Sequence, residues 1–237
     1  MLLKEIENYW DLRAEGFSQS NQDELNGSFA HLELIVSQLP NYAPISTMKA
    51  LDVGCGPGIM GILLAQLGFK VTGLDLSPEM LNQARQNAQN HSVEIEYVQG
   101  NAMEPPFEDE SFDVIITRNL TWNLPDPRLA YESWGKLLKP KGVLINFDGN
   151  HFYFYKDPSY DDPTRISSHK HLNGVDVSVI EKIAKNLELS HHLRPYYDLK
   201  LLEELGWGKA TSTVLKSEEK DDKTLIRDFL ITVIKHA

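Results

Sequence analysis

Three glycines spaced two residues apart follow a short apolar strand in the stretch ALDVGCGPGIMG, residues 50–61. A glycine loop between a strand and a helix normally lets a nucleotide lie close to the backbone. Here an acidic side chain, Asp52, stands at the mouth of the loop, where it would repel a phosphate. The loop therefore raises the question of which nucleotide tolerates a carboxylate at that place.

Two phosphate-binding interpretations of Gly54, Gly56 and Gly58 fail on the residues present. A P-loop requires Lys and Ser or Thr after its last glycine, and GIMGILL supplies neither. A dinucleotide fingerprint requires glycine where this chain has Ile59, and its pyrophosphate would meet Asp52. The compound that fits is a nucleoside with positive charge and no phosphate, S-adenosylmethionine, whose ammonium end Asp52 would help to hold indirectly. A turn whose glycines serve packing alone is the other interpretation.

A second carboxylate, Asp75, ends the next predicted strand in VTGLDLS. A carboxylate at that position can accept hydrogen bonds from both ribose hydroxyls. The same contact suits NAD, so Asp75 alone does not discriminate between the two cofactors. A helix N-cap is the structural alternative for Asp75, although Ser77 already fits that position.

The elements that must position these carboxylates alternate between strand and helix patterns. We expect strands at 49–53, 70–76, 94–100, 111–119 and 142–149, with helices at 58–68, 77–90 and 126–140 between them. Such alternation predicts a parallel sheet with helices on both faces. Two helices are expected before residue 47, the second with Leu25, Phe29, Leu32, Val36 and Leu39 at helical spacing. A helix ending at Gly206 and strands at 209–215 and 225–234, joined by the charged turn KSEEKDDK, close the chain.

This order predicts four parts of the chain. Residues 1–47 form an N-terminal helical lid, and residues 48–149 form a cofactor-binding core. Residues 150–194, where the alternation breaks, form a substrate cap insertion. Residues 195–237 form the C-terminal helix and strand hairpin that complete the core.

Composition limits the classes of partner. The 237 residues carry 34 acidic and 23 basic side chains, a net charge of −11, and no Lys or Arg cluster, so we expect no nucleic-acid partner. No apolar run approaches the roughly 20 residues that span a bilayer, so we expect no membrane partner. A charged N-terminus without a signal peptide and a single cysteine, Cys55, favour a cytoplasmic protein. We expect a monomer or a homodimer.

Four motifs, LDVGCGPG, GLDLSPEML, GNAMEPPFEDESFDVI and LLKPKGVLI, occur in an order and spacing that resemble the class I S-adenosylmethionine-dependent methyltransferases. Within that family the chain is most similar to the small-molecule branch that includes quinone-biosynthesis methyltransferases. The resemblance implies an α/β, Rossmann-like, seven-stranded and mostly parallel sheet with its last strand antiparallel, plus N-terminal helices and an inserted cap. It also implies methyl transfer from S-adenosylmethionine to a small-molecule acceptor by in-line displacement.

The resemblance also assigns cofactor contacts. Met80 corresponds to an apolar contact on one face of adenine, with a core methionine as the alternative. Asn101 stands where the family usually has an aspartate that accepts from the adenine amino group, and its carbonyl oxygen can still accept. The motif neighbours Cys55, Leu76 and Ala102 belong to the same expected set.

The acceptor is expected next to TRNLTWNLPDP, at the end of the fourth strand. Asn119 and Trp122 have the spacing of the [N/D]-P-P-[Y/F/W] motif of amino-group methyltransferases, but the two prolines are missing. Alternatively, Asn119 lines the cofactor pocket and Trp122 packs beneath the next helix. Arg118 either faces a carboxylate of the acceptor or pairs with a nearby acid. His151, directly after the fifth strand, is a candidate general base.

The remaining candidates lie outside the motifs. Tyr9, Trp10, Arg13 and Phe17 suit a lid over the cofactor and acceptor, or simple packing of the first helix. The histidines at 169, 171, 191 and 192 could be imagined as metal ligands, but no framework of acidic residues or cysteines accompanies them, and we expect no metal. Two other functions stay open: a non-catalytic S-adenosylmethionine-binding protein and an NAD-dependent reductase. Titration with S-adenosylmethionine and with NAD(H), side by side, distinguishes a methyltransferase from a reductase. Formation of S-adenosylhomocysteine distinguishes a methyltransferase from a non-catalytic binding protein.

Overall fold

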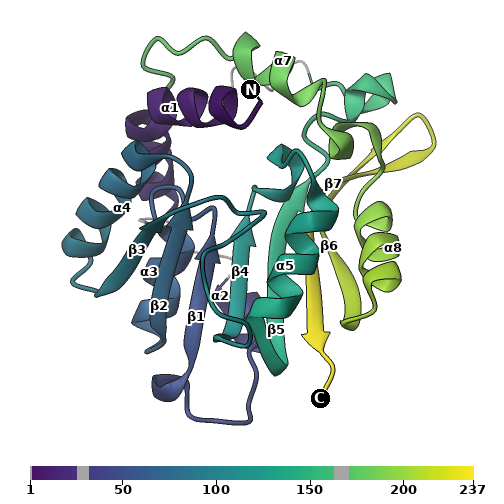
Figure 1. The fold of residues 1–237 in the computed structure, drawn as a ribbon. Coiled ribbons are helices and arrows are strands. Elements are labelled where there is room, and N and C mark those ends of the chain that lie inside the picture. The colour runs from purple at the N-terminus through teal and green to yellow at the C-terminus, as the bar shows by residue number, and fades with distance from the viewer. Residues whose placement is uncertain (1, 26–31, 163–170) are drawn as a thin grey trace.

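The structure is a computed structural model of the chain, and it describes residues 2–25, 32–162 and 171–237. Within these residues seven strands form one sheet in the order β3-β2-β1-β4-β5-β7-β6 (Figure 1). The first five strands pair in parallel, whereas β7 runs antiparallel to both β5 and β6. The predicted fold class is confirmed. The strands are β1 Lys49–Val53, β2 Lys70–Asp75, β3 Ile95–Gln99, β4 Phe112–Arg118, β5 Leu138–Gly149, β6 Gly208–Lys220 and β7 Lys223–Lys235.

Local sequence signals mark several helix ends, but the expected helix 126–140 was too long, because α5 ends at Leu137 and residues 138–140 begin β5. The Ser77 hydroxyl accepts a hydrogen bond from the Met80 amide at 3.0 Å, and Pro78 follows it, so the predicted N-cap is confirmed. Gly206 ends the last helix in the left-handed region, at φ 65°. The helices are α1 Leu2–Leu25, α2 Leu32–Gln38, α3 Ile59–Gln66, α4 Pro78–Asn90, α5 Pro127–Leu137, α7 Ser178–Ala184 and α8 Tyr196–Leu205.

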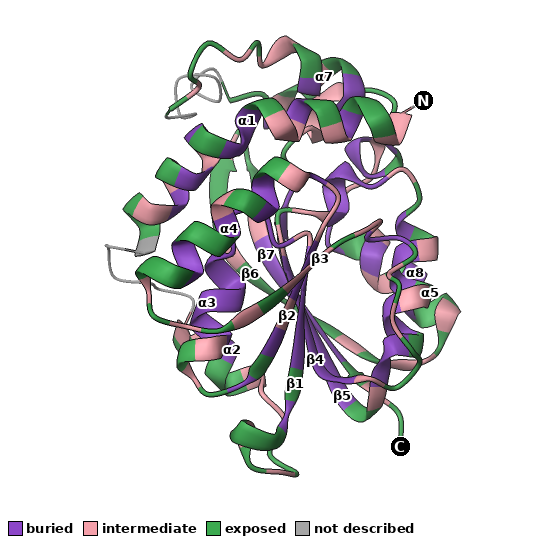
Figure 2. Cartoon of the chain, turned by 60° about the vertical axis from the view of Figure 1, so that its left-hand side comes forward, coloured by how far each residue is buried: buried purple, intermediate pink, exposed green. Residues whose placement is uncertain are grey.

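Two cores cover the two faces of the sheet. Buried side chains of α2 and α3 pack on one face, and those of α5 and α8 pack on the other. Alternate residues of β1 point to opposite sides, with Ala50 in the first core and Leu51 in the second. Figure 2 shows the resulting band of buried residues through the middle of the sheet. Because the first five strands run parallel, their carboxyl ends meet at one edge of the sheet.

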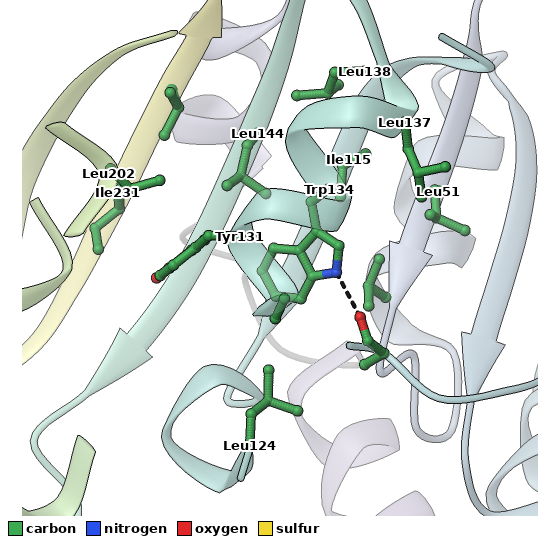
Figure 3. Packing of buried hydrophobic residues seen from close by; sticks show 14 of the residues in the cluster. Leu51, Ile115, Leu124, Tyr131, Trp134, Leu137, Leu138, Leu144, Leu202 and Ile231 are labelled. Carbon is green, nitrogen blue, oxygen red and sulfur yellow. Dashed lines mark hydrogen bonds between the residues drawn. The ribbon is translucent and has the colours of Figure 1, made fainter. Parts of the chain in front are cut away.

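Trp134 anchors α5 to the sheet (Figure 3). Its side chain is fully buried among apolar residues that include Leu51, Ile115 and Leu144. The indole Nε1 donates to the backbone oxygen of Ala102 at 2.8 Å. A buried indole needs such a partner, because its N–H would otherwise lose its hydrogen bond to water without replacement. The contact ties α5 to the loop that follows β3.

Helices α1 and α7 lie side by side across the carboxyl edge of the parallel strands, at the top of Figure 1. Their facing side chains form a third apolar cluster, which also contains Trp122. Both helices thus cover the sheet edge where the chain turns from strands into loops. Among the residues that the structure describes, no helix combines the length and the apolar character required to cross a bilayer.

The C-terminal hairpin differs from the prediction. The expected eight-residue charged turn was wrong, because β6 and β7 continue to Lys220 and Lys223 and leave a two-residue turn. Asp221 and Asp222 both have positive φ, 50° and 59°, as a tight hairpin turn of this type requires. The charged residues belong to an exposed edge strand, where charge is common. At the N-terminus, the second predicted helix was wrong at both ends, because Leu25 belongs to α1 and Leu39 follows the end of α2; Phe29 lies outside the described residues.

Replacing Trp134 by Ala removes a fully buried indole and leaves the Ala102 carbonyl without its partner. We expect a loss of about 3–5 kcal/mol in the free energy of unfolding. Urea denaturation measures the loss, and Tyr196→Ala is the control because Tyr196 is 60% exposed and its variant should stay within about 0.5 kcal/mol. Equal stabilities of the two variants would contradict the role given to Trp134.

Candidate functional site

A cavity of about 380 Å³ opens at the carboxyl edge of the parallel strands. Its size is in the range of small-molecule sites. Its walls come from the ends of β1, β2 and β4, the segments 118–125 and 150–152, the covering helices α1 and α7, and the facing parts of β6 and β7. This cavity therefore lies beside Asp75 and beside the end of the fourth strand, where the sequence predicts the cofactor and the acceptor.

The glycine loop forms one end of this cavity. Gly54 and Gly56 have φ of 63° and 51°, which side chains rarely adopt. A Cβ on Gly54 would lie 2.6 Å from the Leu120 side chain, and one on Gly56 would point toward the Phe17 ring. Both glycines line the cavity. The absence of side chains at these two positions is what leaves the backbone open to a ligand.

Asp75 stands beside the loop, at the end of β2, and lines the cavity. One of its carboxylate oxygens accepts from the Gly56 amide at 2.8 Å and the other from the Ser77 amide at 2.9 Å. Burial raises the pKa of Asp75 to about 6, although these two hydrogen bonds act in the opposite direction. Each oxygen keeps a lone pair for a ligand donor.

Asp52 lies beneath the loop rather than on the cavity wall. It is 1% exposed, and its Oδ2 accepts from the Gly61 amide at 2.8 Å, in the first turn of α3. Burial raises the pKa of Asp52 to about 7. Its charge can reach a ligand only through the loop, which is consistent with the indirect role expected from the sequence.

The other expected cofactor residues divide into two groups. Oδ1 of Asn101 already accepts from the Met103 amide at 3.0 Å, so only its second lone pair is open to an adenine amino group. Cys55 and Gly58 are buried and lie outside the lining. The lining contains Leu76, Met80, Asn101, Ala102 and Asn119.

Helix α1 covers the cavity with the residues expected of a lid. Tyr9, Trp10, Arg13 and Phe17 all line it. Arg13 is 3% exposed, and its Nη1 donates to the backbone oxygen of His171 at 2.9 Å. This contact joins α1 to the segment that precedes α7.

Polar contacts also fasten α1 to α4. Oδ1 of Asp11 accepts from the Ser77 hydroxyl at 2.5 Å, and the Gln22 amide donates to Asn87 at 2.6 Å. Arg118 forms an ion pair with Glu24 at 2.6 Å, so the acid-pairing interpretation of Arg118 is confirmed. The lid is thus held to both ends of the cavity.

His151 stands at the other end of the cavity, just after β5. Its Nε2 lies 3.3 Å from Oδ1 of Asn119 and 3.5 Å from Oδ1 of Asp148. Two oxygens that face the same ring nitrogen favour the tautomer with the proton on Nε2, which leaves the Nδ1 lone pair available. Asn119 reaches this position from a left-handed turn, φ 54°, which asparagine tolerates well.

Asp148 is held by a buried ion pair. Nη1 of Arg194 lies 2.9 Å from Oδ2 of Asp148, close enough for an ion pair but not aligned as a hydrogen bond. The same carboxylate oxygen accepts from the Thr121 hydroxyl and from the Trp122 amide at 3.0 Å. Burial alone would raise the pKa of Asp148, but the Arg194 guanidinium and the His151 ring hold it well below its usual value.

The network continues into α8. Nε and Nη2 of Arg194 each donate to the Asp198 carboxylate at 2.8 Å, and the Tyr131 hydroxyl donates to the same carboxylate at 2.7 Å. Every carboxylate oxygen of Asp148 and Asp198 therefore has a donor. These contacts hold the loop after β4 against the end of β5, and among the described residues only Nη1 of Arg194 in this ion-pair network makes no hydrogen bond.

Sequence reasoning did not single out three residues of this end: Asn123, Asp148 and Asp228. Asn123 lines the cavity, and its Oδ1 is buried without a hydrogen-bond partner among the described residues. Asp148 ends a strand, as Asp75 does, and that shared signal could have found it. The only sequence feature that marks Asp228 is its position as a charged residue within the apolar strand LIRDFLITV.

Of the histidines considered as metal ligands, His169 lies outside the described residues. Nε2 of His191 is bonded to the backbone oxygen of Lys185 at 2.8 Å, and His192 stacks on the Tyr197 ring at 3.8 Å. Within the described ranges, no group of three or more His, Cys, Asp or Glu side chains is arranged to hold a metal ion.

A family model described as "Methyltransferase domain" matches residues 51–146, which include the glycine loop, Asp75 and the end of β4. Residues 51–146 therefore match a methyltransferase domain, and the chain resembles the class I S-adenosylmethionine-dependent methyltransferases. Two curated relatives are named "Ubiquinone biosynthesis O-methyltransferase". That of Colwellia psychrerythraea is 32% identical over 140 residues, 58% of this chain and 57% of the relative. That of Haemophilus ducreyi is 36% identical over 130 residues, 51% of this chain and 55% of the relative. The chain thus spans a little over half the length of these relatives.

Solved structures share the fold of this methyltransferase domain. A methyltransferase from Aquifex aeolicus has a TM-score of 0.58 at 15% identity, over 92% of this chain and 98% of that one. One from Methanosarcina mazei has a TM-score of 0.61 at 23% identity, over 86% of this chain and 97% of that one. At these identities the likeness concerns the fold alone.

The residues of the methyltransferase domain fit its cofactor, S-adenosylmethionine. The loop glycines leave a backbone cradle that a Cβ at either position would narrow or fill. Asp75 keeps acceptor capacity for two hydroxyls, and Met80 offers an apolar wall beside it. No Lys or Arg side chain is among the residues of the glycine loop, so nothing there favours a pyrophosphate.

The raised pKa values of Asp52 and Asp75 predict how the cofactor-free protein responds to pH. In the unfolded chain both carboxyls lose their protons near pH 4, whereas the folded protein retains them up to about pH 7 and 6. Because the folded state binds more protons in this window, these groups make the free energy of unfolding fall as pH rises, by up to about 1.4 kcal/mol per pH unit each. Urea denaturation between these pH values measures the slope.

Asp52→Asn isolates the contribution of the buried carboxyl, because its amide can still accept from Gly61 but does not titrate here. The variant should show a shallower decline of stability from pH 4 to 7 than the native protein. Identical slopes would mean that Asp52 ionises normally in the folded state.

Proposed function

We propose that this protein transfers a methyl group from S-adenosylmethionine to a small molecule, with His151 as the general base. One observation carries the proposal: a single cavity joins a glycine loop and ribose-type carboxylate at one end to a paired histidine at the other. The first end lies over β1 and β2 and the second over β4 and β5, at the same edge of the sheet, where a donor and an acceptor can meet. The glycine loop contains no Lys or Arg and has Asp52 beneath it, so it suits a phosphate-free cation better than a dinucleotide. This preference disfavours the NAD-dependent reductase.

In this proposal the first end holds the cofactor. Asp75 accepts the ribose hydroxyls, Met80 packs on adenine, and Asn101 binds the adenine edge. The amino-acid part lies along Gly54 and Gly56, within reach of the charge of Asp52 beneath the loop. When bound, the cofactor supplies an electrophilic methyl carbon on a positive sulfur.

His151 acts at the other end. Asn119 and Asp148 hold its Nε2 proton, so Nδ1 takes the proton that the acceptor atom releases. Asp148 stabilises the imidazolium that results, and Arg194 keeps Asp148 in place and ionised. The arrangement follows the general pattern of a base oriented by a carboxylate.

Positioning contributes more than proton transfer. Alignment of the acceptor with the methyl group can supply about 7–11 kcal/mol, whereas a general base contributes about 10²–10⁴-fold in rate. Helices α1 and α7 provide the enclosure, because Trp10 and Phe17 from one and Ile180 from the other face the cavity. We therefore assign residues 1–47 and 150–194 to the lid and cap of the acceptor site.

Asp75→Ala removes the carboxylate that would bind the ribose. We expect binding of S-adenosylhomocysteine, measured by calorimetry, to weaken about 10- to 150-fold, because a charge-assisted hydrogen bond contributes roughly 1.5–3 kcal/mol. Asp109→Ala, at an exposed loop position, is the control and should bind as the native protein does. Unchanged affinity in Asp75→Ala would place the ribose elsewhere, and binding of NAD in place of S-adenosylhomocysteine would overturn the function.

His151→Gln keeps a donor toward Asp148 but removes the basic ring nitrogen. With any acceptor that the native protein methylates, we expect kcat to fall about 10²–10⁴-fold. The affinity for S-adenosylhomocysteine should not change, because His151 lies at the acceptor end. Formation of S-adenosylhomocysteine from a panel of small amines and phenols is the assay, with His236→Gln as the matched control. A native rate in His151→Gln would remove the histidine from the mechanism.

A further inference from the structure

Asp228 is an unpaired carboxylate in the wall of the acceptor end. It lines the cavity and is partly buried. Among the residues that the structure describes, no side chain forms an ion pair or hydrogen bond with its carboxylate. By contrast, the other carboxylate near His151, Asp148, is saturated by Arg194 and three further donors. A carboxylate left open to a cavity is a ready partner for a ligand cation or donor.

The strand register brings Asp228 to this place. It pairs with Gly149 of β5 on one side and with Lys216 of β6 on the other. Irregularities in the β6–β7 pairing flank the Lys216–Asp228 pair, and such bulges redirect side chains at sheet edges. The result is a charged side chain at the same edge as the carboxyl ends of β4 and β5.

Gly149 allows Asp228 and His151 to approach one another. A Cβ on Gly149 would lie 2.9 Å from Oδ1 of Asp228 and 3.0 Å from the His151 ring carbon Cε1. Both groups therefore border the small space that the glycine leaves empty. An acceptor atom that gives its proton to His151 would lie close to the Asp228 carboxylate.

The cations near Asp228 do not neutralise it. Arg227 is committed to Glu218 at 2.7 Å and to the backbone oxygen of Tyr160 at 2.8 Å. Lys216 is exposed and forms no ion pair with Asp228, although it lies opposite on the neighbouring strand. Even if the lysine swung across, an exposed pair of this kind is weak and a ligand could displace it.

Asp228 also lies outside the cofactor end. Asp75 is on β2 and Asp228 on β7, four strand positions apart in the sheet order. At about 4.8 Å per strand this is a separation of roughly 19 Å, with β1, β4 and β5 between them. The rings of Trp122 and Phe152, 4.9 Å apart, line the cavity on the Asp228 side, and Trp122 also contacts His151.

We infer that the methyl acceptor is a protonated amine on an apolar body, and that Asp228 is the residue that selects it. The inference rests on the proposed function and names its substrate class. The ammonium group lies against the Asp228 carboxylate, and the Trp122 and Phe152 side chains that line the same cavity suit the apolar body. An acceptor with a carboxylate in the same place is repelled. The family model matches residues 51–146, a range that does not include β7 and Asp228.

The chemistry balances without a further reactant. His151 Nδ1 takes one proton from the ammonium, which frees the nitrogen lone pair. That pair forms the N–C bond as the C–S bond breaks, and the bond electrons remain on sulfur. The methylated amine is again a cation beside Asp228, and His151 releases its proton to solvent.

Three matched probes test the charge preference: 2-phenylethylamine, 2-phenylethanol and 3-phenylpropionate. Each is titrated into the full-length protein saturated with S-adenosylhomocysteine, and binding is measured by calorimetry. We expect the amine to bind at least about 10-fold more tightly than the alcohol, and the carboxylate to bind most weakly. Asp228→Asn should abolish the preference, whereas Asp222→Asn, the same change in the exposed hairpin turn, should retain it.

The outcomes separate the two proposals. If S-adenosylhomocysteine does not bind, the proposed function fails. If it binds but the alcohol or the carboxylate binds as well as the amine, only the amine inference fails. It also fails if the preference survives Asp228→Asn, or if none of the probes binds at millimolar concentration. Asp228→Asn is expected to fold, since the native side chain has no partner to lose, and unchanged S-adenosylhomocysteine binding verifies this. With S-adenosylmethionine, 2-phenylethylamine should carry one methyl group in place of one hydrogen, as mass spectrometry detects.

Discussion

The buried ion pair between Arg194 and Asp148 is the contact on which the acceptor end depends. It joins the segment before α8 to the end of β5, and Asp148 in turn holds the Trp122 amide, the Thr121 hydroxyl and the His151 ring. Two buried charges are costly unless every donor and acceptor is satisfied. Here the single guanidinium of Arg194 lies between two carboxylates, Asp148 and Asp198, which the Thr121, Trp122 and Tyr131 donors also hold, so the arrangement is rigid. Breaking one partner would leave an uncompensated charge and release three cavity-forming segments at once.

The cavity has a carboxylate at each end, and the two differ in how they are held. Asp75 is anchored by backbone amides of the loop that it helps to shape, so its position is fixed before any ligand arrives. Asp228 has no such anchor and faces the cavity with its charge unsatisfied. The first arrangement suits recognition of a cofactor that never varies. The arrangement of Asp228 leaves its carboxylate to be paired by a group of the acceptor. In this way a common fold can acquire a specificity of its own.

Helix α1 links the two ends mechanically. Asp11 is bonded to Ser77 beside the ribose carboxylate, Phe17 stands over Gly56, and Trp10 and Arg13 line the same cavity. A movement of this helix would therefore open both binding regions together. The contacts between α1 and α4 are polar and partly exposed, whereas the sheet beneath is held by two apolar cores. Polar, water-accessible contacts open at lower cost than a packed core, so the lid is the part of the structure best able to move.

The sequence by itself determined the parts that depend on local chemistry. The glycine loop, the carboxylate Asp75, the N-cap Ser77 and the alternation of strands and helices were all readable because each rests on residues close together in the chain. The hairpin turn was misread because charged residues occur both in turns and on exposed edge strands, and only pairing distinguishes the two. The clustering of His151 with Asp148, Asn119 and Asp228 was decided by tertiary structure alone. Asp228 is 77 residues from His151 in the chain, and only the antiparallel register of β7 against β5, with a glycine at the crossing, brings the two to the same cavity wall.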